Sequence, residues 1–293
     1  MMLTRKILLK TLRRLYWVAK QDPVEEELRG WNWDKPPVKP RAYFGLGVSE
    51  VSSKYCPTRR DIWLRRVVKA KPDYESAPQL RFGKLVHQII HWVFTESRKM
   101  LTLGYPGWVV YEELSSKTTD LLRELGVGEE KWAIDFYKTV LLAVASEAEE
   151  AQAVNGSIPA IGWTPWVTEC KVDGSYIGLS NSLSIDALTE GGVIVEFKYG
   201  KPAGFHKLTL AGYSLALEAN LEVPFDYGIL VYINGIPSSR PRISVKPVYI
   251  SNELRRWFLD ERDEIIDMLL SEMEPPKPAS CPMNCPFRGV CGK

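Results

Sequence analysis

The sequence predicts an α/β fold in which one mixed β-sheet is flanked by helices. Apolar residues recur at helical spacing through much of the first half of the chain, and strand-like runs begin only near residue 158. A further helical segment separates three strand-like runs from two later ones. This order is typical of one sheet covered by helices. With 293 residues, of which 45% are hydrophobic, the chain can bury a substantial core.

The first 48 residues, 1–48, are expected to form a basic arm and a connector. Residues 1–20 contain six lysines and arginines and no acid, with leucines at helical spacing. Such a helix could lie on a nucleic-acid backbone or pack on its own domain, and the pattern fits both. The proline-rich segment Trp31–Tyr43 is typical of an extended connector.

Residues 49–157 are expected to be mainly helical. A short helix near Ser49, a possible N-cap, precedes a break at Cys56-Pro57 and then a strongly basic helix. The segment 79–101 has the broad apolar stripe of an amphipathic helix, and residues 108–155 are expected to be mostly helical.

Residues 158–250 are expected to form the sheet. The strand-like runs, which are rich in β-branched and aromatic residues, are 166–172, 175–188, 192–200, 226–235 and 243–250. Two further helices are expected at about 205–220 and 252–272. Prolines in the cysteine-bearing tail should keep that tail from forming a helix.

Charge and hydropathy argue against a membrane protein and a secreted one. No apolar run reaches the ~18 residues needed to span a bilayer. The N-terminus is too charged for a secretory signal. We therefore expect an intracellular, cytoplasmic protein. Few Asn and Gln beside many Glu, Lys and Arg are also typical of a thermophilic source.

Two charged residues lie side by side in the third strand-like run. Alternation places Val195 and Phe197 on one face of that strand, and Glu196 and Lys198 on the other. Asp186 lies ten residues before Glu196 across a turn, so adjacent antiparallel strands can bring both carboxylates to one end of the sheet. Mg²⁺ and Mn²⁺ prefer carboxylate oxygens, and a neighbouring lysine can stabilise developing negative charge. The pattern suits metal-dependent phosphodiester cleavage, but it is short, recurs by chance and also fits a simple salt bridge.

Two histidines, His87 and His91, lie one turn apart on the helix that precedes the strands. A histidine near an apolar helix face is more often a core residue than a ligand. Their spacing does not decide which imidazole would be used.

Several motifs together resemble a known family. The series Gly83-x-x-x-His87, Asp186, Glu196-Phe197-Lys198 and a helix bearing Tyr213 resembles the RecB-type branch of the PD-(D/E)xK nucleases. The segment Lys54–Leu64 and the terminal cysteine triplet resemble the CRISPR-associated, iron–sulfur, RecB-like exonucleases, which comprise the Cas-four group and its archaeal type I-A relatives. The resemblance covers about 49–291. It implies a RecB-like nuclease domain at 49–274, with a restriction-endonuclease-like core, and a cysteine tail at 275–293.

The resemblance also implies roles for single residues. A Mg²⁺ or Mn²⁺ ion would be bound by His87, Asp186, Glu196 and the carbonyl of Phe197. Asp186 and Glu196 would thus serve catalysis together with Lys198.

Three further residues are expected to support the site. Glu169 matches an upstream acidic position of the relatives. Tyr213 lies on the helix after the Glu-x-Lys strand, where the relatives usually carry Gln-x-x-x-Tyr, and Thr209 occupies the position of that Gln. Positions i and i+4 share a helix face, so Thr209 and Tyr213 can both point at the site.

Cysteine spacing predicts a metal centre. Cys281-x3-Cys285-x5-Cys291 places three thiolates within reach of one centre, and Cys56, also followed by proline, is the best fourth ligand. Cys170 lies inside a strand and is expected to be a small buried residue. Four thiolates suit either Zn²⁺ or iron–sulfur. The resemblance favours [4Fe–4S], with [2Fe–2S] as a variant, acting as a structural staple rather than a redox sensor.

Basic and aromatic residues alternate after Cys56. Arg59 and Arg60 are the expected phosphate contacts, and Tyr55 and Trp63 could stack on bases. The segment also fits a solvated helix face with Trp63 pointing inward.

Together, these features predict a metal-dependent DNA exonuclease that acts on single-stranded ends. The resemblance implies that it trims DNA for CRISPR spacer acquisition, with the CRISPR integrase and other adaptation proteins as partners. Two alternatives remain: a non-catalytic DNA-binding subunit of that machinery, and a zinc-stapled nucleic-acid-binding module.

Overall fold

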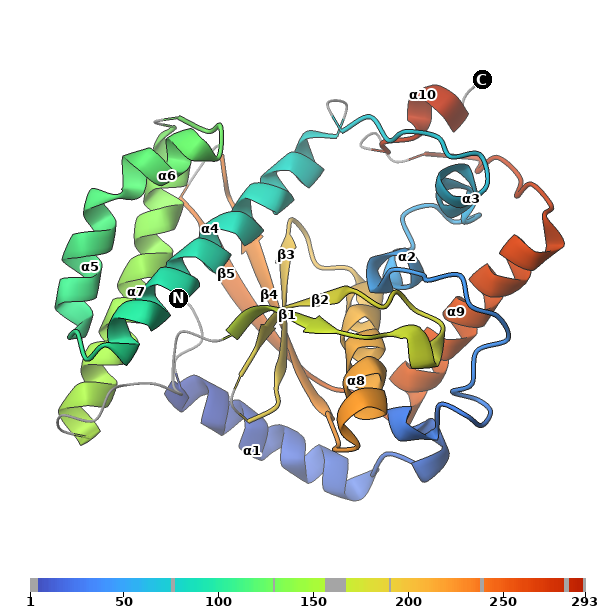
Figure 1. Ribbon diagram of the computed structural model, residues 1–293, viewed down its shortest axis with the longest axis horizontal. Helices are drawn as coiled ribbons and strands as arrows, with labels where there is room; N and C mark the ends of the chain where they lie inside the picture. The colour runs from blue at the N-terminus through green and yellow to red at the C-terminus, as the bar shows by residue number, and fades with distance from the viewer. Residues whose placement is uncertain are drawn as a thin grey trace.

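A mixed five-stranded sheet crosses the centre of the molecule (Figure 1). The computed structural model describes residues 5–74, 77–128, 130–155, 167–189, 191–237, 240–281 and 285–291. In spatial order the strands are β1 (Val167–Val172), β2 (Leu183–Leu188), β3 (Ile194–Tyr199), β4 (Tyr227–Asn234) and β5 (Arg242–Tyr249). Only β3 and β4 pair in parallel, and the other neighbours are antiparallel. The predicted mixed α/β architecture is confirmed.

Helices cover both faces of this sheet. One face packs against α4 (Pro78–Thr102), and α7 (Lys131–Asn155) shares that apolar core, while α5 (Gly107–Ser116) and α6 (Thr118–Glu124) pack on α7. The other packs against α2 (Val48–Ser52), α8 (Lys207–Leu221) and α9 (Asn252–Ser271). The short α3 (Arg60–Arg66) lies beyond α2, as Figure 1 shows. Helix α8 is the crossover that parallel pairing of β3 and β4 requires.

Strand β3 has the predicted alternation. Val195 and Phe197 are buried in the core under α4 and α7, whereas Ile194 is buried in the core under α8. Helices cover both faces of the sheet at β3, so its apolar residues are buried on both faces. Glu196 and Lys198 consequently lie on the α8 face, inside the protein rather than on its surface.

The N-terminal arm packs on its own protein. Helix α1 (Arg5–Gln21) lies along β5, and its Leu8 joins the core under α4 and α7. Its outer face still exposes Tyr16, Trp17 and several basic side chains. The phosphate-binding interpretation of that outer face stays a prediction.

The connector is not the extended spacer that its prolines predicted. It contains two short 3₁₀ turns, η1 (Glu26–Leu28) and η2 (Gly30–Asn32), and Leu28 and Val38 are fully buried. Arg262 of α9 donates to the Val38 carbonyl at 2.6 Å. Interspersed apolar residues and these backbone contacts therefore hold the segment against the core of the protein.

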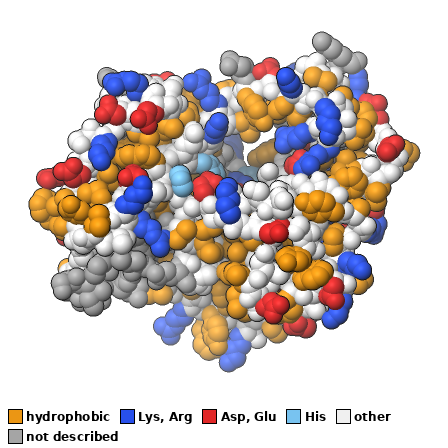
Figure 2. Space-filling view, viewed as in Figure 1, with side chains coloured by type: hydrophobic (Ala, Val, Ile, Leu, Met, Phe, Trp, Pro, Cys, Tyr) orange, Lys and Arg blue, Asp and Glu red, His pale blue; other side chains and the backbone are white. Residues whose placement is uncertain are grey.

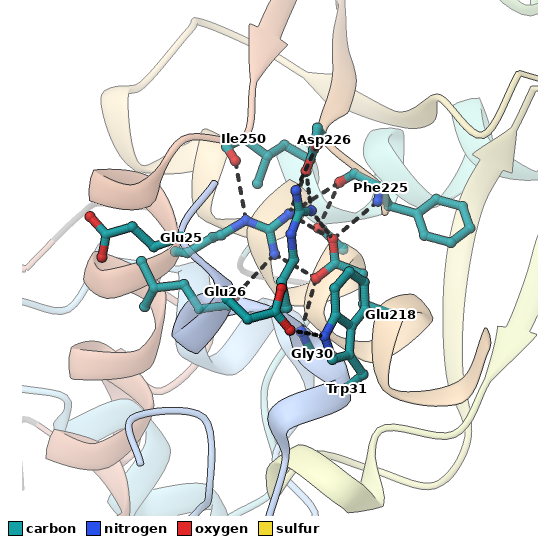
Figure 3. Close-up of polar contacts among 12 residues, drawn as sticks. Glu25, Glu26, Gly30, Trp31, Glu218, Phe225, Asp226 and Ile250 are labelled. Carbon is teal, nitrogen blue, oxygen red and sulfur yellow. Dashed lines mark hydrogen bonds and ion pairs between the residues drawn. The ribbon is translucent and has the colours of Figure 1, made fainter. Parts of the chain in front are cut away.

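A buried ion network fixes the connector to the sheet (Figure 3). Glu218 of α8 binds Arg255 of α9 at 2.8 Å and Arg29 of the connector at 2.8 Å, and Glu218 and Arg255 are fully buried. Asp226, just before β4, binds both arginines. Gly30 approaches α8 so closely that an added Cβ would lie 2.1 Å from the carbonyl oxygen of Leu215. A glycine is therefore required there.

Two expected elements differ from the structure. The run 175–188 forms a strand only at its end, because Ser175–Ile177 is a 3₁₀ turn (η3) whose backbone bonds to the Asp173 carboxylate. The tail does contain a short helix, α10 (Arg288–Cys291), which starts two residues after Pro286 and so avoids its missing N–H. Ser49 also does not cap α2, whose N-cap is Gly47. Among the described helices, none is both long and apolar enough to cross a membrane.

Candidate active site

Strands β2 and β3 separate at Asp186. They are paired only through Ala187 with Val195 and Leu188 with Ile194. Next to those pairs, the Asp186 carboxylate accepts a hydrogen bond from the backbone N–H of Phe197 at 2.8 Å. The side chain thus replaces a ladder partner and is fixed in the fork between the strands.

Helix α4 brings His87 to the same fork. Its Nδ1 lies 3.3 Å from Asp186 Oδ1. Burial alone would lower the pKa of His87, but the charges of Asp186 and Glu196 outweigh it and raise that pKa to about 9. Burial would likewise raise the pKa of Asp186, yet His87 holds it below its usual value. His91 is bound to Thr168 Oγ1 at 2.7 Å, so His87 is the histidine at the carboxylates.

Glu169 joins this group from β1. It lies opposite Asp186, between the pairs Thr168–Ala187 and Cys170–Ile185, and its φ of 54° interrupts regular pairing. Its carboxylate accepts a hydrogen bond from the Ser184 hydroxyl. A positive φ outside glycine is costly and concentrates at functional sites.

The structure gathers His87, Glu169 and Asp186 more closely than the sequence indicated. One possible metal-ligand atom from each residue lies within 4.8 Å of the other two. No other group of three His, Cys, Asp or Glu residues in the described part of the chain meets this condition. The family resemblance gave Glu169 only a supporting part, because a glutamate at a strand end is commonplace.

Glu196 and Lys198 form an ion pair deeper in the site. Lys198 Nζ lies 2.6 Å from Glu196 Oε1. Burial and then the Asp186 charge raise the pKa of Glu196 to about 7. Burial would lower the pKa of Lys198, but Glu196 outweighs it and keeps the ammonium charged.

The carboxylates fit a hard divalent cation. Glu196 Oε2 is buried and has no hydrogen-bond partner among the described residues. An orphaned buried carboxylate oxygen is costly unless something else binds it. With Asp186 and Glu169 it gives the site three carboxylates, the donors that Mg²⁺ and Mn²⁺ prefer. Glu196 lies outside the group whose donor atoms are within 4.8 Å of one another, so the structure brings His87 and Asp186 together with Glu169 rather than with Glu196. Phe197 uses its N–H on Asp186, and the expected role of its carbonyl as a ligand stays a prediction.

Thr209 and Tyr213 both point from α8 toward the site. Thr209 Oγ1 lies 3.5 Å from Lys198 Nζ and donates to Ser52 Oγ at 3.1 Å. Tyr213 donates to the carbonyl of Ser184 at 2.6 Å, and burial raises its pKa well above the usual value. Threonine at the position of the relatives' glutamine therefore still contacts the site lysine.

These residues open into a cleft of about 640 Å³. Figure 2 shows a hollow on this face with basic, acidic and histidine side chains around it. The cleft is bounded by α2, α3, α4 and the residues before α8. The candidate path for the substrate therefore lies between α4 and the segment after α2.

The same cleft is lined by four cysteines, Cys56, Cys281, Cys285 and Cys291. Burial raises the pKa of Cys285, and the negative charges of Asp61, Cys281 and Cys56 raise it further, although a backbone hydrogen bond opposes the shift. An all-sulfur donor set facing one cavity fits an iron–sulfur or zinc centre. No three of these sulfur atoms lie within 4.8 Å of one another in the described part of the chain. Cys170 lies on β1 and is half-buried.

Arg59 and Arg60 do not have the surface position expected of phosphate contacts. Both are buried, at 9% and 8% exposed. Arg59 binds Glu261 and backbone carbonyls, and Arg60 binds the carbonyl of Pro275 at 2.6 Å and the Glu274 carboxylate. Tertiary partners that the local pattern could not show bind the terminal nitrogens of both arginines, whereas the buried Nε of Arg60 has no partner among the described residues. Their role in this structure is to hold α3 to α9 and the tail.

Two other cations line the cleft instead. Arg65 of α3 is 45% exposed and lies over the Phe287 ring at 5.5 Å, and Lys84 of α4 is exposed. Arg65 stood among the basic residues of the sequence pattern. Lys84 was missed, although it lies one residue after Gly83 on the helix that carries His87.

Known proteins are similar to this chain over nearly its full length. A family model described as CRISPR-associated exonuclease Csa1 matches residues 1–293. A Thermoproteus tenax protein named CRISPR-associated exonuclease Csa1 is 33% identical over 297 residues, with 99% of each chain covered. A protein of the same name from Saccharolobus solfataricus is 33% identical over 278 residues, with 92% of each covered. The family resemblance of the motifs is confirmed, and the chain belongs to the CRISPR-associated exonuclease Csa1 family.

Proposed function

We propose that this protein is a metal-dependent exonuclease that hydrolyses phosphodiester bonds at single-stranded DNA ends. The observation that carries the proposal is the convergence of His87 and Asp186, which line the cleft, with Glu169 behind them and with the Glu196–Lys198 pair in the same cleft. The exonuclease names of both relatives support the activity. The CRISPR part of those names supports a role in preparing DNA for spacer acquisition, alongside an integrase and other adaptation proteins.

Each side chain has a defined task in this proposal. Mg²⁺ or Mn²⁺ bound by His87, Glu169, Asp186 and Glu196 would activate water and neutralise charge on the phosphate. Asp186 is pre-positioned by the Phe197 N–H, so the carboxylate needs no rearrangement.

Lys198 is the fixed positive charge of the site. Glu196 and the Thr209 hydroxyl hold its ammonium at 2.6 and 3.5 Å. It is therefore placed to stabilise the negative charge that develops on the phosphate during hydrolysis.

We also propose that Cys56, Cys281, Cys285 and Cys291 bind a [4Fe–4S] cluster, with [2Fe–2S] as a variant. All four line the cleft, and the set joins the segment after α2 to the chain end. The cluster would staple the tail over the candidate active site, and its binding free energy would add to folding.

Activity and its loss on single substitutions test the nuclease proposal. Protein purified without oxygen should degrade single-stranded DNA only when Mn²⁺ or Mg²⁺ is added. Lys198→Ala should lower kcat by about 10²–10³-fold, the usual cost of one electrostatic group at a transition state. Asp120→Asn, at an exposed site on α6, is the control and should cleave like the parent. A Lys198→Ala protein with parental activity would remove the reaction from this cleft. A parent protein that degrades no DNA with either ion would favour the DNA-binding subunit.

The cluster has its own test. Anaerobically purified protein should contain iron and absorb near ~400 nm. Cys285→Ser should lose both signals, whereas Cys170→Ser should keep them. Stoichiometric zinc with no such absorbance would identify a zinc staple instead.

A further inference from the structure

One wall of the cleft is aromatic. Tyr55, in the segment after α2, and Phe205, in η4 (Gly204–His206) before α8, both line it. Their ring centroids are 4.9 Å apart and the rings are nearly perpendicular, at 88°. Phe205 is partly buried, whereas Tyr55 is 57% exposed. We refer to Tyr55 and Phe205 as the aromatic wall.

The exposed ring of Tyr55 is nevertheless held in place. Its hydroxyl lies 3.0 Å from Nε2 of His206. The Nδ1 of His206 accepts from the backbone N–H of Ala203, and the Tyr232 hydroxyl lies 3.3 Å from the same nitrogen. Since Nδ1 accepts, Nε2 carries the proton of the neutral imidazole and donates to the Tyr55 oxygen. Burial and the Lys198 charge lower the pKa of His206 to about 4, in agreement with a neutral ring.

This hydrogen bond leaves two features of Tyr55 free. Its own hydroxyl proton is still available as a donor, because the oxygen accepts from His206. More than half of its surface is exposed, and the residue lines the cleft. A tyrosine with only a structural role would stabilise the fold more if its ring were buried. A ring that is fixed and exposed at a cleft is instead pre-organised to bind a planar partner.

The aromatic wall stands beside the reactive groups. The charge of Lys198 acts on the pKa of Tyr55, opposing the rise that burial causes. The opposite side of the cleft is formed by α4, with Lys84 exposed and Gly83 carrying no side chain. A nucleic-acid strand that lay between α4 and the aromatic wall would meet a cation on one side and an exposed aromatic surface on the other. That combination is typical of sites for single-stranded nucleic acid.

We propose that the aromatic wall stacks an unpaired base next to the phosphate that is cut. The proposal rests on the nuclease function above and deepens it, because it names the feature that selects single strands. Inside a duplex, each base is covered on both faces by its neighbours, so an internal paired base cannot offer a face to Tyr55. A frayed or single-stranded end can.

Abasic oligonucleotides test this directly. A set of single-stranded oligonucleotides, each with one abasic position near the end, is bound to the protein in EDTA, so that no cleavage occurs. At one position, removal of the base should weaken binding by about 5- to 150-fold, the range expected when one base–aromatic stack is lost. Tyr55→Ala should weaken binding of the intact oligonucleotide and abolish the difference between intact and abasic. Tyr55→Phe keeps the ring and should retain most of that difference.

Matched controls separate stacking from damage to the fold. Tyr105→Ala removes a tyrosine that is 45% exposed outside the cleft, and it should keep the full abasic difference. A Tyr55→Ala protein that retains the abasic difference would overturn the proposal, and so would a parent protein that shows none at any position. The nuclease proposal fails separately: a parent that discriminates the abasic position in EDTA but never cuts with Mn²⁺ would keep the aromatic wall and lose the enzyme.

Discussion

The carboxylate of Glu218 is the most heavily used acceptor of the buried network, and Glu218→Gln should be strongly destabilising. It accepts from Arg29 Nη1, from both terminal nitrogens of Arg255, and from the backbone N–H groups of Gly30 and Phe225, at 2.8 to 3.1 Å. A glutamine keeps the shape but removes the charge and turns an NH₂ group toward donors. Breaking one side of a buried ion pair costs about 3–5 kcal/mol. Asp226 still binds both arginines, which argues for the lower part of that range.

Chemical denaturation followed by circular dichroism measures this cost. At about 2–4 °C per kcal/mol, a loss of about 3–5 kcal/mol should lower Tm by about 6–20 °C. Glu222→Gln, at the exposed C-terminal end of α8, is the control and should stay within about 0.5 kcal/mol of the parent. A loss below about 1 kcal/mol for Glu218→Gln would refute the idea that this network holds the connector to the sheet.

Two other substitutions follow from the same structure. Burial would raise the pKa of Glu261, but hydrogen bonds from Lys54, Arg59 and Trp257 outweigh burial and lower that pKa. The contribution of the Glu261 carboxylate to folding stability is therefore full above the unfolded pKa of about 4.3. It is lost as pH falls through the lower folded pKa. Glu261→Gln should therefore cost about 2 kcal/mol at pH 7 and progressively less below about pH 4 in urea titrations, and a pH-independent cost would contradict this assignment. The double change Arg65→Ala with Lys84→Ala should reduce the slope of log K against log salt for single-stranded DNA by about 1.4, and an unchanged slope would place the phosphates elsewhere.

The central strand was predictable because its information is local. Period-two alternation is a property of the backbone, so Phe197 and Glu196 had to face opposite sides once a strand formed there. The same holds for Thr209 and Tyr213, whose spacing of four places both on one helix face.

The rest of the site depends on contacts between distant segments. Glu169 became a candidate ligand through its register opposite Asp186 and its positive φ, neither of which a local pattern reveals. Arg59 and Arg60 looked like a DNA surface because their carboxylate and carbonyl partners lie more than 200 residues away or in a turn. Basic residues that are close in the sequence therefore show that a segment is charged, but they do not show whether its side chains are exposed.

The central claim is that the carboxylates around Asp186 form a cation site and not only a buried ion network. Mn²⁺ binding tests this claim most directly. Titration of the metal-free protein, with free Mn²⁺ followed by electron paramagnetic resonance, should show one tight ion per chain. Asp186→Asn should weaken that site by more than ~100-fold while Asp120→Asn leaves it unchanged, and nuclease activity should follow Mn²⁺ occupancy across the titration. Equal Mn²⁺ binding by Asp186→Asn and the parent, or DNA degradation that continues at zero occupancy, would contradict the account.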